Sequence, residues 1–197
     1  MIEVEIRGEL TAKQAESLKK RLAREGKHVR RQEREMILLR GYPGYDKDPT
    51  KRENDIRIRR TDGKTELMLK RKVSDGNVRR REYSLPIEGD HFETAKTIAV
   101  AFGCTEGLWI HRYSDVYERD GVEWVVVEAP DRSGMIVKRY YEAELLVESK
   151  QDIPHARRQL MAAAKQLDMP VLKTDEAMRG FIYELDRTVN VEISLND

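Results

Sequence analysis

The sequence predicts a single α+β domain, in which an antiparallel β-barrel with a charged interior is flanked by amphipathic helices. Three observations lead to this fold class. Strand-like segments alternate charged and apolar residues, Asp-Gly pairs separate several of them as hairpin turns, and four helical segments carry an apolar stripe. No low-complexity linker divides the chain, so we expect residues 1–197 to form one domain.

The N-terminal segment is predicted to be a strand followed by a helix. Residues 2–8 alternate in the manner of a strand. Thr11 and Gln14 form a capping-box pair at the start of a helix that runs to about Glu25, where Gly26 ends it. Residues 28–39 have mixed charge and receive no assignment, and a loop follows at residues 41–49.

An antiparallel meander is predicted next, because strand-like runs and turn signals follow one another closely. The strands are expected at residues 55–59, 66–72 and 78–87. Asp62-Gly63 and Asp75-Gly76 mark the two turns that join them.

The second half repeats the order of helix and strands. A helix opens near Asp90 and ends at Gly103, with Phe92, Ala95, Ile98, Ala99 and Phe102 on its apolar side. Strands follow at 108–119, 122–128 and 136–149, then a helix from Asp152, a helix at 175–185 and a strand at 189–195. We expect the four helices to cover the apolar outer face of the barrel.

The bulk composition limits the possible functions. Charged residues make up 37% of the chain, yet the net charge is only +1, so a non-specific nucleic-acid binder with a strong basic excess is not expected. Cys104 is the only cysteine, which excludes an internal disulfide. No run resembles a signal peptide or reaches membrane-spanning length, so we expect a soluble cytoplasmic protein without membrane partners.

Charge gathers on one face of strand after strand. Glu3, Glu5 and Arg7 share a face, because successive side chains of a strand point to opposite sides. The same alternation pairs Arg57 with Arg59, Lys70 with Lys72, Arg80 with Glu82, and Glu142 with Glu144. For any one strand, a face in contact with water is the simpler explanation. Several such strands together indicate a barrel with a charged lumen.

The carboxylates and the cationic side chains would bind two different parts of one ligand. Carboxylates bind hard divalent cations such as Mg²⁺ or Mn²⁺. Guanidinium and ammonium groups bind phosphate oxygens. Together they favour a polyphosphate bound with a divalent metal.

The opening Glu3-Val4-Glu5-Ile6-Arg7 resembles the ExExK signature of the CYTH superfamily, also called triphosphate tunnel metalloenzymes. That group includes inorganic triphosphatases, thiamine triphosphatases and class IV adenylyl cyclases. Further motifs resemble the family in the same order along most of the chain. Residues 55–59 resemble its LRIR strand, Leu69-Lys70 resembles its strand lysine, and Arg80 with Glu82 resembles its R-x-E strand. Arg112 resembles a basic strand residue of the family, Glu128 resembles an acidic residue before a loop, and residues 142–144 resemble its late ExE. The resemblance implies a closed tunnel of about eight antiparallel strands.

The resemblance also implies a role for each matching residue. Metal ligands would be Glu3, Glu5, Glu142 and Glu144, with Glu128 as a further candidate. Triphosphate oxygens would be bound by Arg7, Arg57, Arg59, Lys70, Arg80 and Arg112, while Lys72 and Glu82 would line the tunnel. Glu5, Glu144 and Lys70 are the expected catalytic residues. Arg7 departs from the motif, since lysine is usual at that position.

Three functions are compatible with this resemblance. Metal-dependent hydrolysis of inorganic triphosphate or of a triphosphate-bearing organic compound is the leading one. The alternatives are a class IV-type cyclase that makes cyclic AMP from ATP, and a binder of nucleotide or RNA 5′-triphosphate without turnover. The expected partner is a small-molecule triphosphate, with an RNA 5′ end the one nucleic acid considered, and with a homodimer as an open arrangement.

Overall fold

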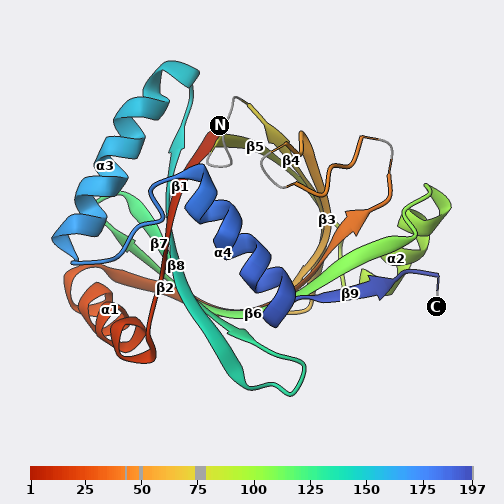
Figure 1. Ribbon diagram of the computed structural model, residues 1–197, viewed down its shortest axis with the longest axis horizontal. Coiled ribbons are helices and arrows are strands. Elements are labelled where there is room, and N and C mark those ends of the chain that lie inside the picture. The colour runs from red at the N-terminus through yellow and green to blue at the C-terminus, as the bar shows by residue number, and fades with distance from the viewer. Residues whose placement is uncertain (43, 49–50, 74–78, 197) are drawn as a thin grey trace.

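The structure is a computed structural model that describes residues 1–42, 44–48, 51–73 and 79–196, with residues 79 and 80 described as backbone only. The strands in this part of the chain are β1 (Ile2–Glu9), β2 (Lys27–Arg40), β3 (Asn54–Thr61), β4 (Lys64–Lys72), β5 (Arg79–Pro86), β6 (Glu106–Arg119), β7 (Val122–Pro130), β8 (Ile136–Val147) and β9 (Val191–Ser194). The helices are α1 (Ala12–Glu25), α2 (Phe92–Ala101), α3 (Ile153–Gln166) and α4 (Asp175–Thr188), with a 3-10 turn at Lys150–Asp152. The predicted α+β class is confirmed (Figure 1).

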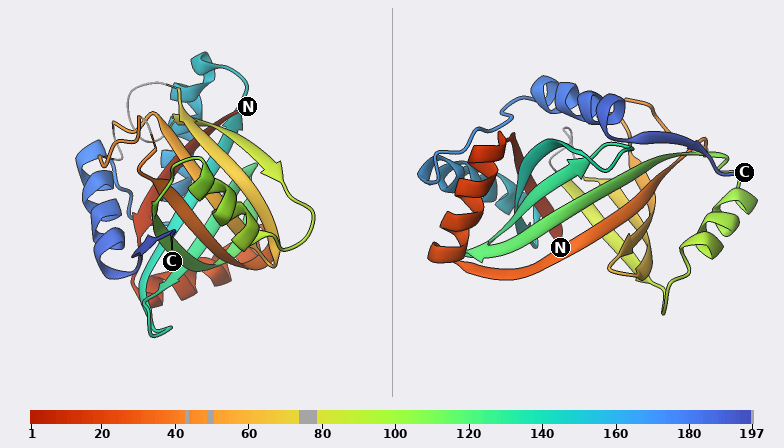
Figure 2. Two further views of the ribbon diagram at one scale, coloured as in Figure 1. Left: turned by 90° about the vertical axis from the view of Figure 1, so that its right-hand side faces the viewer. Right: turned by 90° about the horizontal axis from the view of Figure 1, so that it is seen from below.

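The strands form one antiparallel sheet. Their order is β2-β3-β4-β5-β1-β8-β7-β6-β9, and β2 also pairs with β6. That additional pairing extends from Lys27 to Arg40, so β2 is paired with β3 along one edge and with β6 along the other. The pairing between β1 and β5 is short, with Glu3 opposite Arg80 and Val4 opposite Arg79. Figure 2 shows the long strand β2, in orange, running beside β6, in green.

The long strand β2 occupies residues that the sequence analysis leaves unassigned. Its first five residues are exposed, and charged residues such as Arg30 and Arg31 fall on both of its faces. Alternation of apolar and polar residues, the usual signal of a strand, is therefore missing there. Pairing with two neighbours supplies the backbone hydrogen bonds that define β2.

Two of the predicted hairpin turns are confirmed. Asp62 and Gly63 have φ angles of 47° and 77°, and Asp120 and Gly121 have φ angles of 53° and 75°. Positive φ at both central residues is the property that favours Asp-Gly in tight hairpins. The predicted turn at Asp75-Gly76 lies outside the described residues.

Helices α1 and α3 cover the outer face of β1, β7 and β8. The capping box predicted for α1 is present, with the Thr11 side chain accepting from the backbone N–H of Gln14 at 3.2 Å. Leu18 and Leu22 of α1 and Leu160 of α3 join Trp124 of β7 in the largest apolar core. None of the helices in the described part of the chain combines the length and the apolar character needed to cross a membrane.

Helix α2 packs against β3 and β4 with a narrower apolar face than predicted. Phe92, Ala95 and Ala99 are buried, as expected. Ile98 and Phe102, also predicted on the buried side, are 51% and 79% exposed. In the described part of the chain, α2 packs mainly on β3 and β4, at one end of the molecule (Figure 1).

Helix α4 corrects the expectation that all four helices lie on the outer face. Along β7, Trp124 points toward α1 and α3, so Val125 and Val127 point to the opposite, inner side. Phe181 of α4 packs on that inner side, with its ring centroid 5.3 Å from that of Tyr140 on β8. Figure 1 shows α4 crossing in front of the sheet rather than behind it. It therefore lies over the inner face of the sheet, opposite to the face that α1 and α3 cover.

Candidate functional site

Three carboxylates from two neighbouring strands form a compact group. Glu3 and Glu5 lie two residues apart on β1, and Glu5 is directly opposite Glu144 on β8. Each of the three offers an oxygen, and these oxygens all lie within 4.8 Å of one another. Like charges directly opposite in a sheet are destabilising unless something compensates them. The two carboxylates that share a face of β1, Glu3 and Glu5, thus lie next to Glu144 of β8.

Two of the three carboxylates, Glu3 and Glu144, have raised pKa values. Burial raises the pKa of Glu3 to about 7, despite the attraction of Lys70. Burial, and then repulsion from Glu3 and Glu5, raises the pKa of Glu144 well above its ordinary value. Close carboxylate oxygens that resist ionisation are the donor set expected for a hard divalent cation, which would relieve both effects. Glu3, Glu5 and Glu144 therefore fit a Mg²⁺ or Mn²⁺ ion.

Glu142 lies in the same interior but has a different environment. Its carboxylate forms ion pairs with Arg7 Nη2 at 3.0 Å and Arg112 Nη1 at 3.2 Å. Burial alone would raise its pKa, but Arg112 and Arg7 outweigh burial and lower the pKa to about 2. Glu142 therefore anchors two guanidinium groups, and it is not among the three carboxylates that converge.

The unusual Arg7 uses two nitrogens at once. Its Nε is bonded to Glu5, and its Nη2 contacts Glu142 at 3.0 Å. A lysine ammonium is a single point charge, whereas the guanidinium fork can bridge carboxylates that lie on two strands. Arginine at this position thus links the three-carboxylate group to the Arg112 side of the interior.

Glu128, the further metal candidate, does not join the group, and that expectation is corrected. It lies on β7 with the same parity as Trp124, so its side chain points outward. Its carboxylate pairs with Lys19 of α1 at 3.1 Å and with Arg139 at 3.2 Å. Glu128 therefore ties α1 to the outer face of the sheet.

The charged residues line one cavity of about 480 Å³. All eight strands of the series β2-β3-β4-β5-β1-β8-β7-β6 contribute to its wall. Its cationic lining residues among the described side chains are Arg7, Arg30, Arg34, Arg57, Arg59, Lys70 and Arg112. Its acidic lining residues in the same part of the chain are Glu3, Glu5, Glu82, Glu123, Glu142 and Glu144.

Most predicted phosphate-binding residues are held by acids in this cavity. Lys70 Nζ is 3.1 Å from both Glu3 and Glu82, and the attraction of Glu3 keeps the pKa of Lys70 raised although burial opposes it. Arg59 pairs with Glu66 at 2.6 Å, and Arg57 pairs with Asp55 at 2.9 Å. These contacts fix the long side chains before any ligand binds.

The remaining predicted residues, Glu82, Lys72 and Arg80, differ in their relation to the cavity. Glu82 lines the cavity, as expected, between Lys70 and Arg59. Lys72 shares a strand face with Lys70 but is not part of the cavity wall. Arg80 is placed only by its backbone, opposite Glu3, and its side chain lies outside the described residues.

Arg34 is a cavity residue that the sequence analysis missed. Its Nε donates to Thr61 Oγ1 at 3.3 Å, and within the described ranges no carboxylate lies at ion-pair distance from it. Burial, followed by repulsion from Arg112 and Arg59, lowers the pKa of Arg34 to about 9. A half-buried cation next to other cations attracts an anion. The sequence analysis did not identify β2 as a strand, so it could not place Arg34 on a charged strand face.

Glu123 is the second missed residue. It stands directly opposite Glu144 on β7, so Glu123, Glu144 and Glu5 form a row across three adjacent strands. In the sequence it shares parity with Val125 and Val127, which gave no reason to place it on a charged face. Only the strand register shows that it lines the cavity.

The model of the CYTH domain matches residues 1–177. The chain belongs to the CYTH domain family. Among curated proteins, no sequence matches the chain.

Solved structures share the CYTH fold at low sequence identity. The PH1819 protein from Pyrococcus horikoshii is similar, with a TM-score of 0.71, 21% identity, and 92% of this chain and 99% of that chain covered. A protein from Vibrio parahaemolyticus named as a candidate adenylate cyclase has a TM-score of 0.59 and 14% identity, with 86% and 90% covered. HpAC1 from Hippeastrum, described as having a dominant triphosphatase activity, has a TM-score of 0.54 and 16% identity, with 86% and 89% covered.

The CYTH match includes every residue predicted for the site, from Glu3 to Glu144. It ends at residue 177, in the first turn of α4. Most of the helix that lies over the interior is therefore outside the part of the chain that the family model matches.

Proposed function

We propose that this chain is a divalent-metal-dependent triphosphatase that binds its substrate in the charged cavity. The observation that carries the proposal is the arrangement of opposite charges around one space. The converging carboxylates lie on β1 and β8, and the arginines that face them lie on β2, β3 and β6. Since β2 also pairs with β6, β1 and β2 are four strands apart in either direction, and a closed tunnel would put the two sets on opposite walls.

The continuous pairing of eight strands supports a closed tunnel as the binding chamber. Each strand sends alternate side chains inward, and charged residues occupy most of those inward positions. A chamber walled by fixed charges suits a highly charged ligand, because its dipoles and ions need no reorganisation when the ligand enters.

Glu3, Glu5 and Glu144 would hold the divalent metal, which, when bound, supplies positive charge that offsets the carboxylates and polarises the phosphate oxygens. Glu123 lies opposite Glu144 and extends the same acidic row. Binding by these residues would place one end of the triphosphate against β1 and β8.

The cationic wall would bind and orient the rest of the triphosphate. Arg34, Arg57 and Arg59 offer forked N–H donors that match phosphate oxygens. Lys70 stays protonated and acts as a fixed positive charge toward oxygen atoms that gain negative charge during phosphoryl transfer. Arg7 and Arg112, both held by Glu142, complete the wall at the neighbouring strands.

Two other activities on the same site remain as rivals. The name of the Vibrio parahaemolyticus neighbour favours an adenylyl cyclase, and HpAC1 favours a triphosphatase. A binder without turnover is the second rival.

Product analysis tests the proposal. The purified protein is incubated with inorganic triphosphate or ATP in Mg²⁺, in Mn²⁺ or in EDTA, and orthophosphate, pyrophosphate and cyclic AMP are measured. We expect metal-dependent orthophosphate release that Glu5→Gln and Glu144→Gln each abolish while the fold remains intact. Glu148→Gln, on an exposed residue after β8, is the matched control and should retain activity.

The other outcomes are equally informative. Pyrophosphate together with cyclic AMP would replace the hydrolase with the cyclase. Metal-dependent binding with no product would favour the non-catalytic binder. Full turnover in both glutamine variants would overturn the assignment of the metal site.

A further inference from the structure

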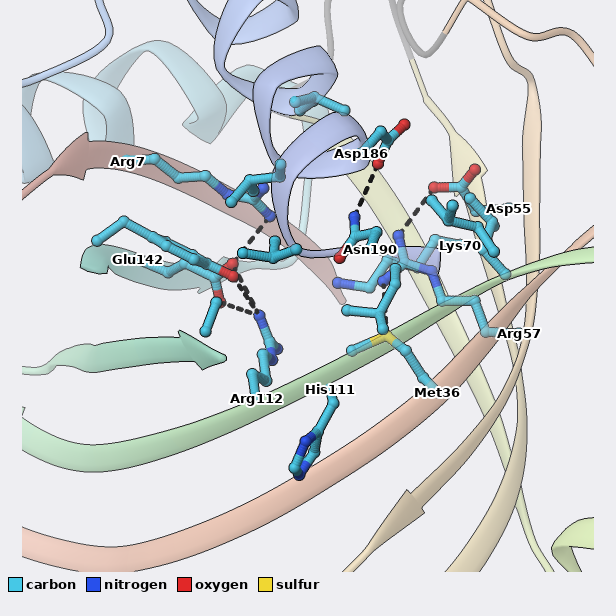
Figure 3. Close-up of a pocket in the computed structure, with 18 of the residues that line it drawn as sticks. Arg7, Met36, Asp55, Arg57, Lys70, His111, Arg112, Glu142, Asp186 and Asn190 are labelled. Atoms are coloured by element: carbon cyan, nitrogen blue, oxygen red, sulfur yellow. Dashed lines mark hydrogen bonds and ion pairs between the residues drawn. The ribbon is translucent and has the colours of Figure 1, made fainter. Parts of the chain in front are cut away.

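A second cavity of about 140 Å³ adjoins the charged one beneath α4. The two cavities share part of their wall, including Glu5, Arg7, Arg57, Lys70 and Arg112. Figure 3 shows this space between those strand residues and the end of α4. A ligand could therefore have one part in each cavity without a break between them.

The lining of this second cavity adds many apolar side chains to charged ones, which include Arg52 and Asp55 as well as the shared residues. Apolar side chains from strands and from α4 form much of its wall: Met36, Leu108, Ile110, Met178, Leu185 and Val189. Flat apolar groups gain by leaving water for such a wall, and methionine sulfur makes favourable contacts with aromatic rings. Triphosphate has no group that would use this surface.

Two hydrogen-bond acceptors stand at the α4 side of the cavity. Asn190 Nδ2 donates to Asp186 Oδ1 at 2.8 Å, which turns the amide oxygen of Asn190 away from Asp186 (Figure 3). The other oxygen of Asp186 is 3.9 Å from Arg40 Nη2, beyond hydrogen-bond distance. A ligand that reaches this side would be held best through N–H donors.

The size of the cavity suits a single ring. An apolar protein cavity of about 150 Å³ is known to hold a molecule of benzene. The cavity beneath α4, at about 140 Å³, is of this size, so one ring would fill it.

We propose that this cavity binds the organic end of the substrate, a single aromatic ring that carries an amino group, with Asp186 and Asn190 accepting its N–H donors. The inference rests on the proposed function, because it requires the phosphate chain to lie in the charged cavity. It makes the substrate a triphosphate ester rather than inorganic triphosphate. Asp186 and Asn190 lie after residue 177, where the family match ends.

A comparison of four triphosphates as substrates tests the ring and its amino group separately. CTP and UTP each have one ring and differ in an amino group against a carbonyl oxygen, ATP has two fused rings, and inorganic triphosphate has none. We expect kcat/KM for CTP to exceed that for UTP by about tenfold or more, which is the effect of one hydrogen bond to a charged group. ATP and inorganic triphosphate should also be poorer substrates than CTP.

Three variants locate the effect. Asp186→Asn should remove most of the preference for CTP over UTP, since an amide can also donate to the carbonyl of UTP. Ile182→Phe, whose ring would fill the cavity from α4, should lower kcat/KM for CTP while inorganic triphosphate is still hydrolysed. Asp175→Asn makes the same change at an exposed position of α4 and should behave as the unchanged protein.

Binding of the nucleosides separates this inference from the proposed function. Cytidine and uridine lack phosphates, and their dissociation constants can be measured by calorimetry in the unchanged protein and in both cavity variants. Absence of hydrolysis with all four triphosphates, but tighter binding of cytidine that Ile182→Phe removes, would overturn the triphosphatase and keep the ring site. Equal kcat/KM for CTP and UTP, unchanged in Asp186→Asn and Ile182→Phe, would overturn the ring site and keep the triphosphatase.

Discussion

Raising the pH should destabilise the metal-free protein, because Glu3 and Glu144 of the candidate metal site resist ionisation. The pKa of Glu3 is raised from its ordinary 4.5 to about 7. Between these two values the folded state holds a proton that the unfolded chain has released, so the free energy of unfolding falls as the pH rises. A difference of about 2.5 pH units corresponds to about 3 kcal/mol.

The pKa shifts of Glu144 and Glu142 do not offset the loss of stability that Glu3 causes between pH 4.5 and 7. Glu144 has a raised pKa and acts in the same direction. Glu142, whose pKa is lowered to about 2, contributes stability that is lost only as the pH falls below 4.5. The decline between pH 4.5 and 7 therefore reports on Glu3 and Glu144, and the raised pKa of Asp186 acts in the same direction.

Thermal unfolding in EDTA at pH 5, 6, 7 and 8 measures the effect. For a chain of this length, about 3 kcal/mol lowers Tm by roughly 6 to 12 °C. Adding Mn²⁺ at pH 8 should restore most of this loss, and Glu144→Gln should both flatten the pH profile and weaken the rescue by Mn²⁺. Glu148→Gln is the exposed control. A Tm in EDTA that is constant or rises over this range, or an undiminished Mn²⁺ shift in Glu144→Gln, would refute the reasoning.

Three further substitutions test other parts of the structure. Arg34→Met should raise KM for triphosphate substrates about tenfold or more, because it removes a half-buried cation from the phosphate wall, whereas Arg132→Met at an exposed loop should leave steady-state kinetics unchanged. Leu160→Ala, at a fully buried position of α3, should cost about 2–5 kcal/mol of unfolding free energy in urea titrations, and a loss below 1 kcal/mol would contradict the packing of that core. Gly180→Ala should stabilise the protein by about 0.5–1 kcal/mol, since a Cβ there meets open space inside a helix; a lower Tm would argue against that environment.

The amino-acid sequence by itself determined most of the elements and half of the candidate site. Alternation along a strand depends only on the backbone, so Glu3, Glu5 and Arg7 had to share a face wherever β1 was placed. Capping residues and Asp-Gly turns act over a few residues, which is why the start of α1 at Thr11 and the turn at Asp62-Gly63 were predicted correctly. The order of these local motifs was also enough to indicate the CYTH family.

Tertiary structure decided which face points inward and which residues meet there. Glu128 and Glu123 lie on the same strand with opposite parity, and only the packing of Trp124 under α1 shows that Glu123 faces the cavity and Glu128 faces out. Arg34 could not be found while β2 had no recognisable pattern, because a strand paired on both edges needs no apolar alternation where both its faces are charged. The position of α4 over the interior was likewise set by partners on β7 and β8. Local sequence specifies which side chains share a face, whereas contacts between distant segments specify what that face encloses.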